Sequence, residues 1–350
     1  MNGRNRTSAL TGIHGILIKR LGALAVVLFG VSVLTFSLYY LSPGDKALAI
    51  AHARYMGEGN APPEVVQAIR EKYALNEPFL TQFKLWVSGY LKGDFGQSLV
   101  SGVPVWEIFL PNLRETLALA CSALLIGLPL AFFLSLVSLW RPGSLYDRIA
   151  VAVASIGAAV PSYWLGLMLI LVFAAWLNWL PSFGTGTPAH LILPAATLAV
   201  WITASQTRLF RSFLLEASSS PFLEALRLRG VGEKEIFWRH ILRHAMVPAI
   251  TMIGLDLAYL LEGAVIVEVI FARGGIGSLL VGSVMSRDYP IVLFLVMFSA
   301  FSYVAINSLI EALQDCLDPR KSLPAPSLRA QRPITTASAT DSPDNTTGDR

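Results

Sequence analysis

Six long, mostly apolar runs divide this chain, and they limit its possible folds more than any other feature of the sequence. The runs are 21–41, 116–139, 149–176, 191–207, 247–271 and 290–313. A helix needs about 20 mostly apolar residues to cross the hydrocarbon core of a bilayer. Lipid offers no hydrogen-bond partners, so a spanning segment satisfies its backbone groups as a helix does. The sequence therefore predicts an all-α, polytopic membrane protein with six transmembrane helices.

The composition argues against a water-soluble protein. Only 14% of the residues are charged and 54% are hydrophobic, whereas soluble domains carry about 25% charged residues. The first apolar run follows Lys19 and Arg20, as the core of a signal peptide would. It is longer than the roughly 7–15 residues of such a core, so we expect 21–41 to remain as the first span.

The positions of Lys and Arg predict how the spans are oriented. With the N-terminus inside, 18 of the 27 Lys and Arg residues fall on the inner side. The two short outer loops hold only Arg273 and Arg287, as expected from the positive-inside rule. We therefore expect both termini in the cytoplasm, with residues 1–20 as a cytoplasmic N-terminus and 42–115 as an outer, periplasmic segment.

Two further segments are too polar to span. Within 42–115, the apolar spacing predicts amphipathic helices over 63–73 and 80–91. Residues 321–350 are rich in Pro, Ser, Thr, Ala and Asp, which favours a disordered cytoplasmic tail.

Three prolines lie inside predicted spans, at Pro129, Pro161 and Pro194. Each removes one hydrogen bond of its helix. Two interpretations stay open, namely kinked helices around a pathway and the ordinary irregularity of membrane helices.

The longest inner loop, 208–247, contains the pattern of a helical hook. Ser220 is suited to cap a helix whose first turn holds Pro221, and residues 222–229 read as that helix. Gly230 predicts a left-handed stop, and a second helix is expected over 233–245. A short rigid helix of this kind suits docking into a partner's groove, from which motion passes to two spans.

The hook also carries a motif. Residues Glu224-Ala225-Leu226-Arg227-Leu228-Arg229-Gly230, followed by Pro248, resemble the EAA loop of ABC-importer permeases. The glycine-to-proline interval resembles the dipeptide, oligopeptide and nickel permease family. Other runs resemble that family in the same order along the chain: Gly93-Asp94-Phe95-Gly96-Gln97-Ser98, Pro161-Ser162-Tyr163-Trp164-Leu165, Val267-Glu268, Arg287-Asp288-Tyr289-Pro290 and Leu317-Asp318-Pro319-Arg320.

Two positions depart from the family pattern. Leu226 stands where the motif has its second alanine, and Arg273-Gly274 stands where the family more often has Trp-Pro. We expect the first to adjust the fit to the ATPase and the second to adjust the outer rim.

The resemblance implies the fold of a type I ABC importer permease, with the permease domain over 112–315. It implies a bacterial inner-membrane subunit that imports peptides or a related small solute with a second homologous permease, two cytoplasmic ATPases and a solute-binding protein. No nucleic-acid partner is implied. Six residues are expected to contact the ATPase: Glu224, Ala225, Arg227, Arg229, Gly230 and His240.

The sequence has no phosphate-binding loop of the form G-x-x-x-x-G-K-[ST]. We therefore expect no enzymatic activity and no bound cofactor in this chain, with ATP and Mg used by the partner ATPases. His240 and His244 have a spacing that suits zinc, but Arg239 and Arg243 flank them. An interface role is favoured, and no metal is expected.

Three acids lie within the fifth run, at Asp256, Glu262 and Glu268. Acids inside a membrane are costly and are candidates for function. All three are candidates for the translocation pathway. For Asp256 and Glu262 a bond to a neighbouring helix is equally open, and Glu268 could instead organise the outer rim.

Two other classes of protein compete with this interpretation. A self-contained secondary transporter would need inverted repeats and midplane charges in paired spans, and a membrane-embedded hydrolase would need a nucleophile and a base; neither pattern is found in the sequence. The identity of the solute stays open among dipeptide, oligopeptide, nickel complex, glutathione-like and opine-like cargo.

Overall fold

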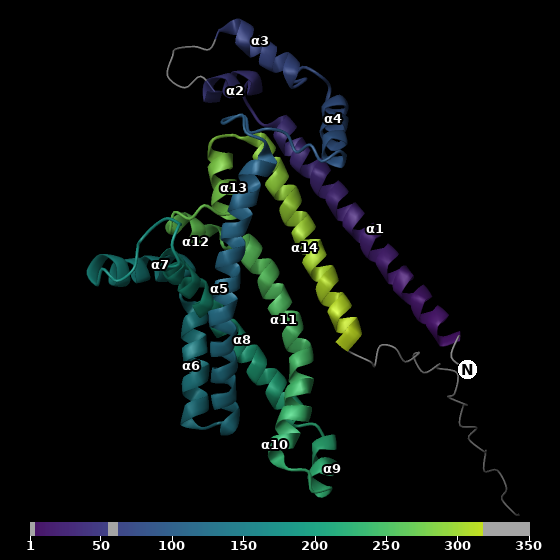
Figure 1. Cartoon of the computed structure of the whole chain (residues 1–350), viewed down its shortest axis with the longest axis vertical. Coiled ribbons are helices and arrows are strands. Elements are labelled where there is room, and N and C mark those ends of the chain that lie inside the picture. The colour runs from purple at the N-terminus through teal and green to yellow at the C-terminus, as the bar shows by residue number, and fades with distance from the viewer. Residues whose placement is uncertain (1–3, 55–61, 318–350) are drawn as a thin grey trace, which may run out of the picture.

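In the computed structural model, which describes residues 4–54 and 62–317, every regular element of the described residues is helical. Long helices run through the middle of the molecule, and some of the shorter ones lie at its two ends (Figure 1). The long helices are α1 (Arg4–Leu41), α5 (Val105–Trp140), α8 (Ala189–Ser218), α11 (Leu242–Gly263) and α14 (Tyr289–Leu317).

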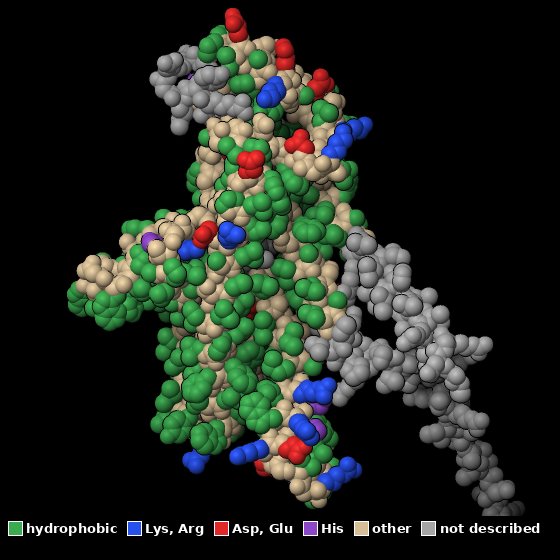
Figure 2. All heavy atoms as spheres, viewed as in Figure 1, with side chains coloured by type: hydrophobic (Ala, Val, Ile, Leu, Met, Phe, Trp, Pro, Cys, Tyr) green, Lys and Arg blue, Asp and Glu red, His purple; other side chains and the backbone are tan. Residues whose placement is uncertain are grey.

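Five helical stretches among the described residues are long and apolar enough to cross a membrane. A sixth span exists if a bent pair counts as one, namely α6 (Leu145–Ala159) with the segment Ser162–Trp176. Figure 2 shows the middle of one face covered largely by hydrophobic side chains, while charged side chains gather mainly towards the two ends. This distribution suits a bilayer around the middle.

The run 149–176, expected as one helix, is two helices that meet at 96°. The second half comprises α7 (Ser162–Leu169) and a π-helix, η1 (Ile170–Trp176). The bend falls at Val160, whose extended backbone is the conformation favoured before proline. Pro161 therefore breaks its span, whereas Pro129 and Pro194 lie inside the continuous helices α5 and α8.

The fifth run also differs from expectation, because α11 ends at Gly263 and a short helix, α12 (Val265–Ile270), follows. Ala264 between them has φ −67° and ψ −10°, which turns the chain out of regular helix. The fourth run extends further than expected. α8 continues to Ser218, so much of the predicted loop 208–247 is helical.

Close packing of α5 on α8 forms the centre of the bundle. Leu119, Ile202 and Leu260 are fully buried in one apolar core with Val267 and Phe271. At Gly127 of α5, an added Cβ would lie 2.9 Å from the Cβ of Ile202 on α8. The two backbones approach as closely as they do because Gly127 has no side chain.

The segment 42–115 contains a small helical unit of α2 (Lys46–Arg54), α3 (Pro63–Lys72) and α4 (Phe79–Leu91), which confirms the helices expected over 63–73 and 80–91. This unit lies at the end of the molecule opposite α9 and α10 (Figure 1). Asp288, before α14, accepts hydrogen bonds from the Ser98 hydroxyl and from the backbone N–H of Leu99 (2.9 Å). The contact joins two of the motifs that the sequence analysis singled out.

Candidate functional site

The helical hook is α9 (Phe222–Leu228), which follows the end of α8 after three residues. Gly230 ends it with φ +81°, which confirms the predicted left-handed stop. The N–H of Gly230 bonds to the carbonyl of Arg227 (2.9 Å), and the N–H of Val231 bonds to that of Leu226 (3.1 Å). These two bonds are the Schellman pattern, which satisfies carbonyls at a helix end.

The start of the hook differs from the sequence prediction. Ser220 was expected to cap the helix, but Pro221 occupies the cap position, and no side chain there forms a capping hydrogen bond. The backbone carbonyl of Ser220 accepts a hydrogen bond from the N–H of Leu223 instead (3.1 Å). A backbone hydrogen bond, and not a side-chain cap, therefore closes the first turn of α9.

One side of the hook packs firmly on the bundle. Leu223 is fully buried against Leu214 of α8 and Ile236, in a core that includes Ile241 and Ala245 of the following segment. Leu226 and Val231, at the two ends of the Schellman turn, pack against the same core. This core therefore joins the hook to both α8 and α11.

The other side of the hook faces outwards. Glu224, Ala225, Arg227 and Arg229 are exposed together with Gly230. Four of the six expected coupling side chains therefore share one accessible surface, with the Gly230 turn beside them.

Leu228 belongs to the same surface and is 85% exposed. The sequence analysis quoted this residue only as part of the motif and did not select it.

Arg227 forms an ion pair with Glu233, at 2.7 Å between Nε and Oε1. The Glu233 carboxylate raises the pKa of Arg227 above its usual value, chiefly through the hydrogen bond. Both side chains are substantially exposed, so the pair contributes little to stability. It does orient the Arg227 side chain next to the loop that follows Gly230.

The second helix of the hook is less regular than predicted. Residues expected to form one helix over 233–245 form α10 (Glu233–Glu235), a π-helical turn η2 (Ile236–Ile241) and the start of α11. Phe222 lies edge-on to the rings of His240 and His244, with centroids 6.1 and 5.3 Å apart. Both imidazoles thus pack against α9.

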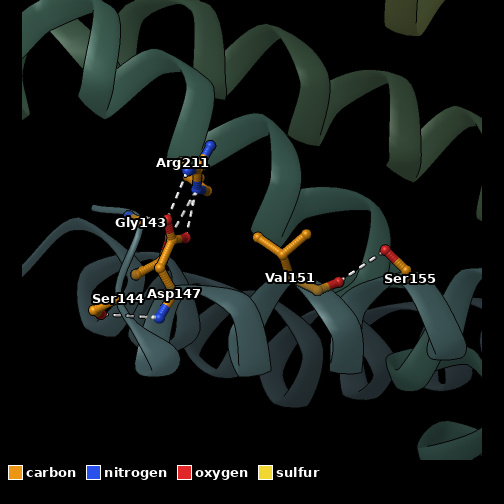
Figure 3. A network of polar contacts seen from close by, with 7 residues as sticks. Gly143, Ser144, Asp147, Val151, Ser155 and Arg211 are labelled. Carbon is orange, nitrogen blue, oxygen red and sulfur yellow. Dashed lines mark hydrogen bonds and ion pairs between the residues drawn. The ribbon is translucent and has the colours of Figure 1, made fainter. Parts of the chain in front are cut away.

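An ion pair with a buried carboxylate joins α8 to the first turn of α6. Arg211 donates from Nε to Oδ1 of Asp147 and from Nη2 to Oδ2, both at 2.9 Å. Ser138 and the N–H of Gly143 also donate to this carboxylate, at 2.5 and 2.8 Å. Figure 3 shows Arg211 directed at the Asp147 carboxylate, and Ser144 beside the backbone N–H of Asp147. No motif or spacing in the sequence predicted this pair.

Asp256 in α11 is 8% exposed and accepts a hydrogen bond from Nε2 of Gln206 in α8, at 2.5 Å. Gln206 is fully buried. The pair therefore bridges the two helices that the hook core also joins. Asp256 was predicted as a candidate from the sequence, whereas Gln206 was not.

Glu268 in α12 is 1% exposed and lies beneath the start of α13 (Ile276–Met285). Its carboxylate accepts hydrogen bonds from the Thr116 hydroxyl (2.5 Å) and from the N–H of Ser278 (3.0 Å). A helix N-terminus stabilises a carboxylate in this position. Gly275 permits the approach, because an added Cβ would lie 2.1 Å from Oε1 of Glu268.

Next to this network, Arg273 is 4% exposed. It forms an ion pair with Glu115 and donates from Nη1 to the carbonyl of His190 (3.3 Å). Arg273 therefore links α5 to the start of α8.

The predicted site residues fall into separate places. The coupling residues gather at one end of the molecule, Asp256 lies between α8 and α11, and Glu268 lies beneath α13. The side chain of Glu262 lies outside the described residues.

Together, the spans and the hook define a multi-pass membrane protein with a structured loop at one end, as a transport subunit has. Residues 123–323 match the family described as binding-protein-dependent transport system inner membrane component, and residues 13–120 match the N-terminal family of such membrane components. The chain belongs to this family of ABC-importer permeases and is a multi-pass inner-membrane protein, whose class works with ATPase and binding-protein partners.

Two relatives match nearly along their whole length. The glutathione transport system permease protein GsiC of Escherichia coli K12 is 34% identical over 307 residues, which are 87% of this chain and 97% of the relative. A putative peptide transport system permease protein of Brucella abortus 2308 is 34% identical over 313 residues, which are 87% of this chain and 98% of the relative.

Solved structures with a similar chain include an amino acid ABC transporter with histidines (19% identity, TM-score 0.47) and the inward-facing MetNI methionine ABC transporter (20% identity, TM-score 0.45). Each match covers 61% of this chain and 94% of the solved chain.

Proposed function

We propose that this permease forms a translocation pathway with a second, similar permease, and that two cytoplasmic ATPases drive it through the surface of α9. The observation that carries the proposal is the two-sided hook. Its buried side is anchored through Leu223, while Leu228 and the charged residues around it are free to contact a partner. A rigid helix with one anchored and one accessible side transmits a partner's motion without bending.

The path of that motion follows from the packing. Closure of the ATPases on ATP displaces α9, and the shared core carries the displacement to α8 and α11. The Asp147–Arg211 pair extends the moving body to the start of α6. The helices then swing between inward-facing and outward-facing arrangements. ATP and Mg are used by the ATPases, and this chain binds no cofactor.

The proposed orientation places both termini and α9 in the cytoplasm, and α2, α3 and α4 outside. The excess of Lys and Arg on the α9 side supports it. The solute-binding protein then delivers its cargo to the end that carries α2–α4.

For the solute we propose a small peptide or a glutathione-like molecule. The support is the full-length similarity to one relative named for glutathione transport and to another named for peptide transport.

The test is reconstitution of the permease with the ATPases and binding protein that it is expressed with. We expect the ATPases to co-purify in mild detergent, and proteoliposomes to take up a labelled tripeptide only when ATP is present on the α9 side. Uptake by this chain alone without ATP would contradict the proposal and would favour a secondary transporter.

A further inference from the structure

Asp256 and Gln206 together leave hydrogen-bonding capacity unused in the middle of the bundle. The carboxylate accepts one bond from Nε2 of Gln206 (2.5 Å), and none of the ion pairs among the described residues includes Asp256. Gln206 is fully buried, and its Oε1 has no hydrogen-bond partner among the residues that the structure describes. One amide oxygen is therefore unsatisfied, and it belongs to the residue that bonds to a carboxylate without an ion-pair partner among these residues.

This arrangement is costly for a purely structural contact. A buried amide oxygen without a donor loses free energy of desolvation. A carboxylate within a membrane span needs a positive partner to remain charged. A bond that served only to join α8 and α11 would not need an acid, because an asparagine at position 256 would accept the same bond.

The unsatisfied amide oxygen calls for a donor, and the carboxylate beside it is neutralised when that donor carries a positive charge. A protonated amine meets this requirement, because an ammonium group has three N–H donors and no acceptor.

An aromatic pair on the same two helices adds to the match. Trp201 of α8 and Tyr259 of α11 stack with centroids 4.6 Å apart and planes at 24°. Tyr259 lies three residues after Asp256, which puts the two on neighbouring positions of one helix face. Tyr259 is 55% exposed. The exposed face of an aromatic ring attracts cations, so an ammonium group meets favourable contacts on its way to Asp256.

We infer that Asp256 and Gln206 form a binding site for the protonated amino group of the transported solute. This inference rests on the proposed function and adds to it a chemical requirement, a free amine. It concerns the stretch of the pathway between α8 and α11.

The test compares two probes, a labelled tripeptide with a free amino terminus and the same tripeptide N-acetylated. Uptake is measured in proteoliposomes that contain the complete importer. The variants are Asp256→Asn, which keeps the shape and the bond to Gln206, and Thr203→Val as a matched control. Thr203 is buried one turn before Gln206 and bonds to the carbonyl of Gly127 (3.2 Å), so its loss disturbs packing without touching the site.

The wild-type importer is expected to prefer the free amine, and Asp256→Asn to reduce the preference at least tenfold by slowing uptake of the free-amine probe. Thr203→Val should keep the wild-type ratio. An unchanged ratio in Asp256→Asn, or an equal loss in Thr203→Val, would overturn the inference while leaving the proposed function intact. If the wild-type importer took up neither probe, the proposed peptide function would fail, and this inference with it.

Discussion

Arg211 holds Asp147 through two parallel hydrogen bonds of 2.9 Å, and this pair ties the first turn of α6 to the C-terminal half of α8. Seven residues after Arg211, α8 ends at Ser218, and the hook begins soon after. The carboxylate is 6% exposed and the guanidinium side chain 30% exposed. The hook therefore extends from a part of α8 that this ion pair already holds in place.

The first prediction follows from this pair. Replacing Arg211 with Met leaves the Asp147 carboxylate buried without its counter-ion, which costs about 3 kcal/mol. Arg239→Met is the control, because it removes an exposed ion pair with Glu235 and should cost less than about 0.5 kcal/mol. Denaturant unfolding of both variants in detergent measures the difference, and equal losses would show that the Asp147 pair is not special.

A second prediction concerns the turn at Gly230. Gly230→Val forces a β-branched residue into φ +81°, which costs at least about 1–2 kcal/mol and disturbs the Schellman turn. Gly232→Val is the matched control. Both glycines have open space around them, but Gly232 has φ −68°, which a valine adopts without strain.

We expect Gly230→Val to abolish most uptake while the ATPases still hydrolyse ATP, and Gly232→Val to retain coupling. The ratio of solute imported to ATP hydrolysed is the measurement. Normal uptake and normal stimulated hydrolysis in Gly230→Val would mean that the loop has been assigned wrongly.

Leu228 supplies a third prediction. Changing it to Glu should weaken ATPase binding about tenfold, or ~1.4 kcal/mol, because an apolar side chain leaves the contact surface. Stability should hardly change, since Leu228 is 85% exposed.

Leu91→Glu is the control at the opposite end of the molecule, where that leucine is 84% exposed. Titration of detergent-solubilised permease with purified ATPase gives both affinities. Equal weakening by the two changes would point to a general loss of integrity.

The fourth prediction tests the packing around Glu268. Gly275→Ala places a methyl group where the Glu268 carboxylate lies, and overpacking of this kind costs about 1–3 kcal/mol. Gly282→Ala in the same helix, α13, has no neighbour within 4 Å and should not lower stability. Thermal unfolding followed by tryptophan fluorescence compares them; a Gly275→Ala protein as stable as Gly282→Ala would contradict the described network.

The sequence predicted those parts of the fold that depend on local patterns. Apolar runs located the spans, and Gly230 marked the end of the hook because few other residues adopt its backbone conformation. The outer helices followed from their apolar spacing. The bend at Val160 was only half predicted: Pro161 signalled a kink, but the size of the bend depends on how α7 packs against α8 and α12.

Long-range pairings could not be read from the sequence. Gln206 and Asp256 are 50 residues apart, and Arg211 and Asp147 are 64 apart. Each pair forms only because α8 packs on its neighbours. The prediction that Ser220 caps α9 was wrong for a related reason. Backbone hydrogen bonds close the connection from α8, and Pro221 stands at the cap position.

The most direct measurement for the whole account is a cross-link between the hook and an ATPase. Glu224→Cys, in a chain with Cys121 and Cys316 replaced by Ser, is co-expressed with the ATPase that carries a cysteine in its surface groove, and a Leu91→Cys chain serves as the control. The account predicts a cross-linked product from position 224 whose yield changes on ATP binding, and none from position 91. A product from position 91 alone, or labelling of position 224 from the outside of intact cells, would contradict it.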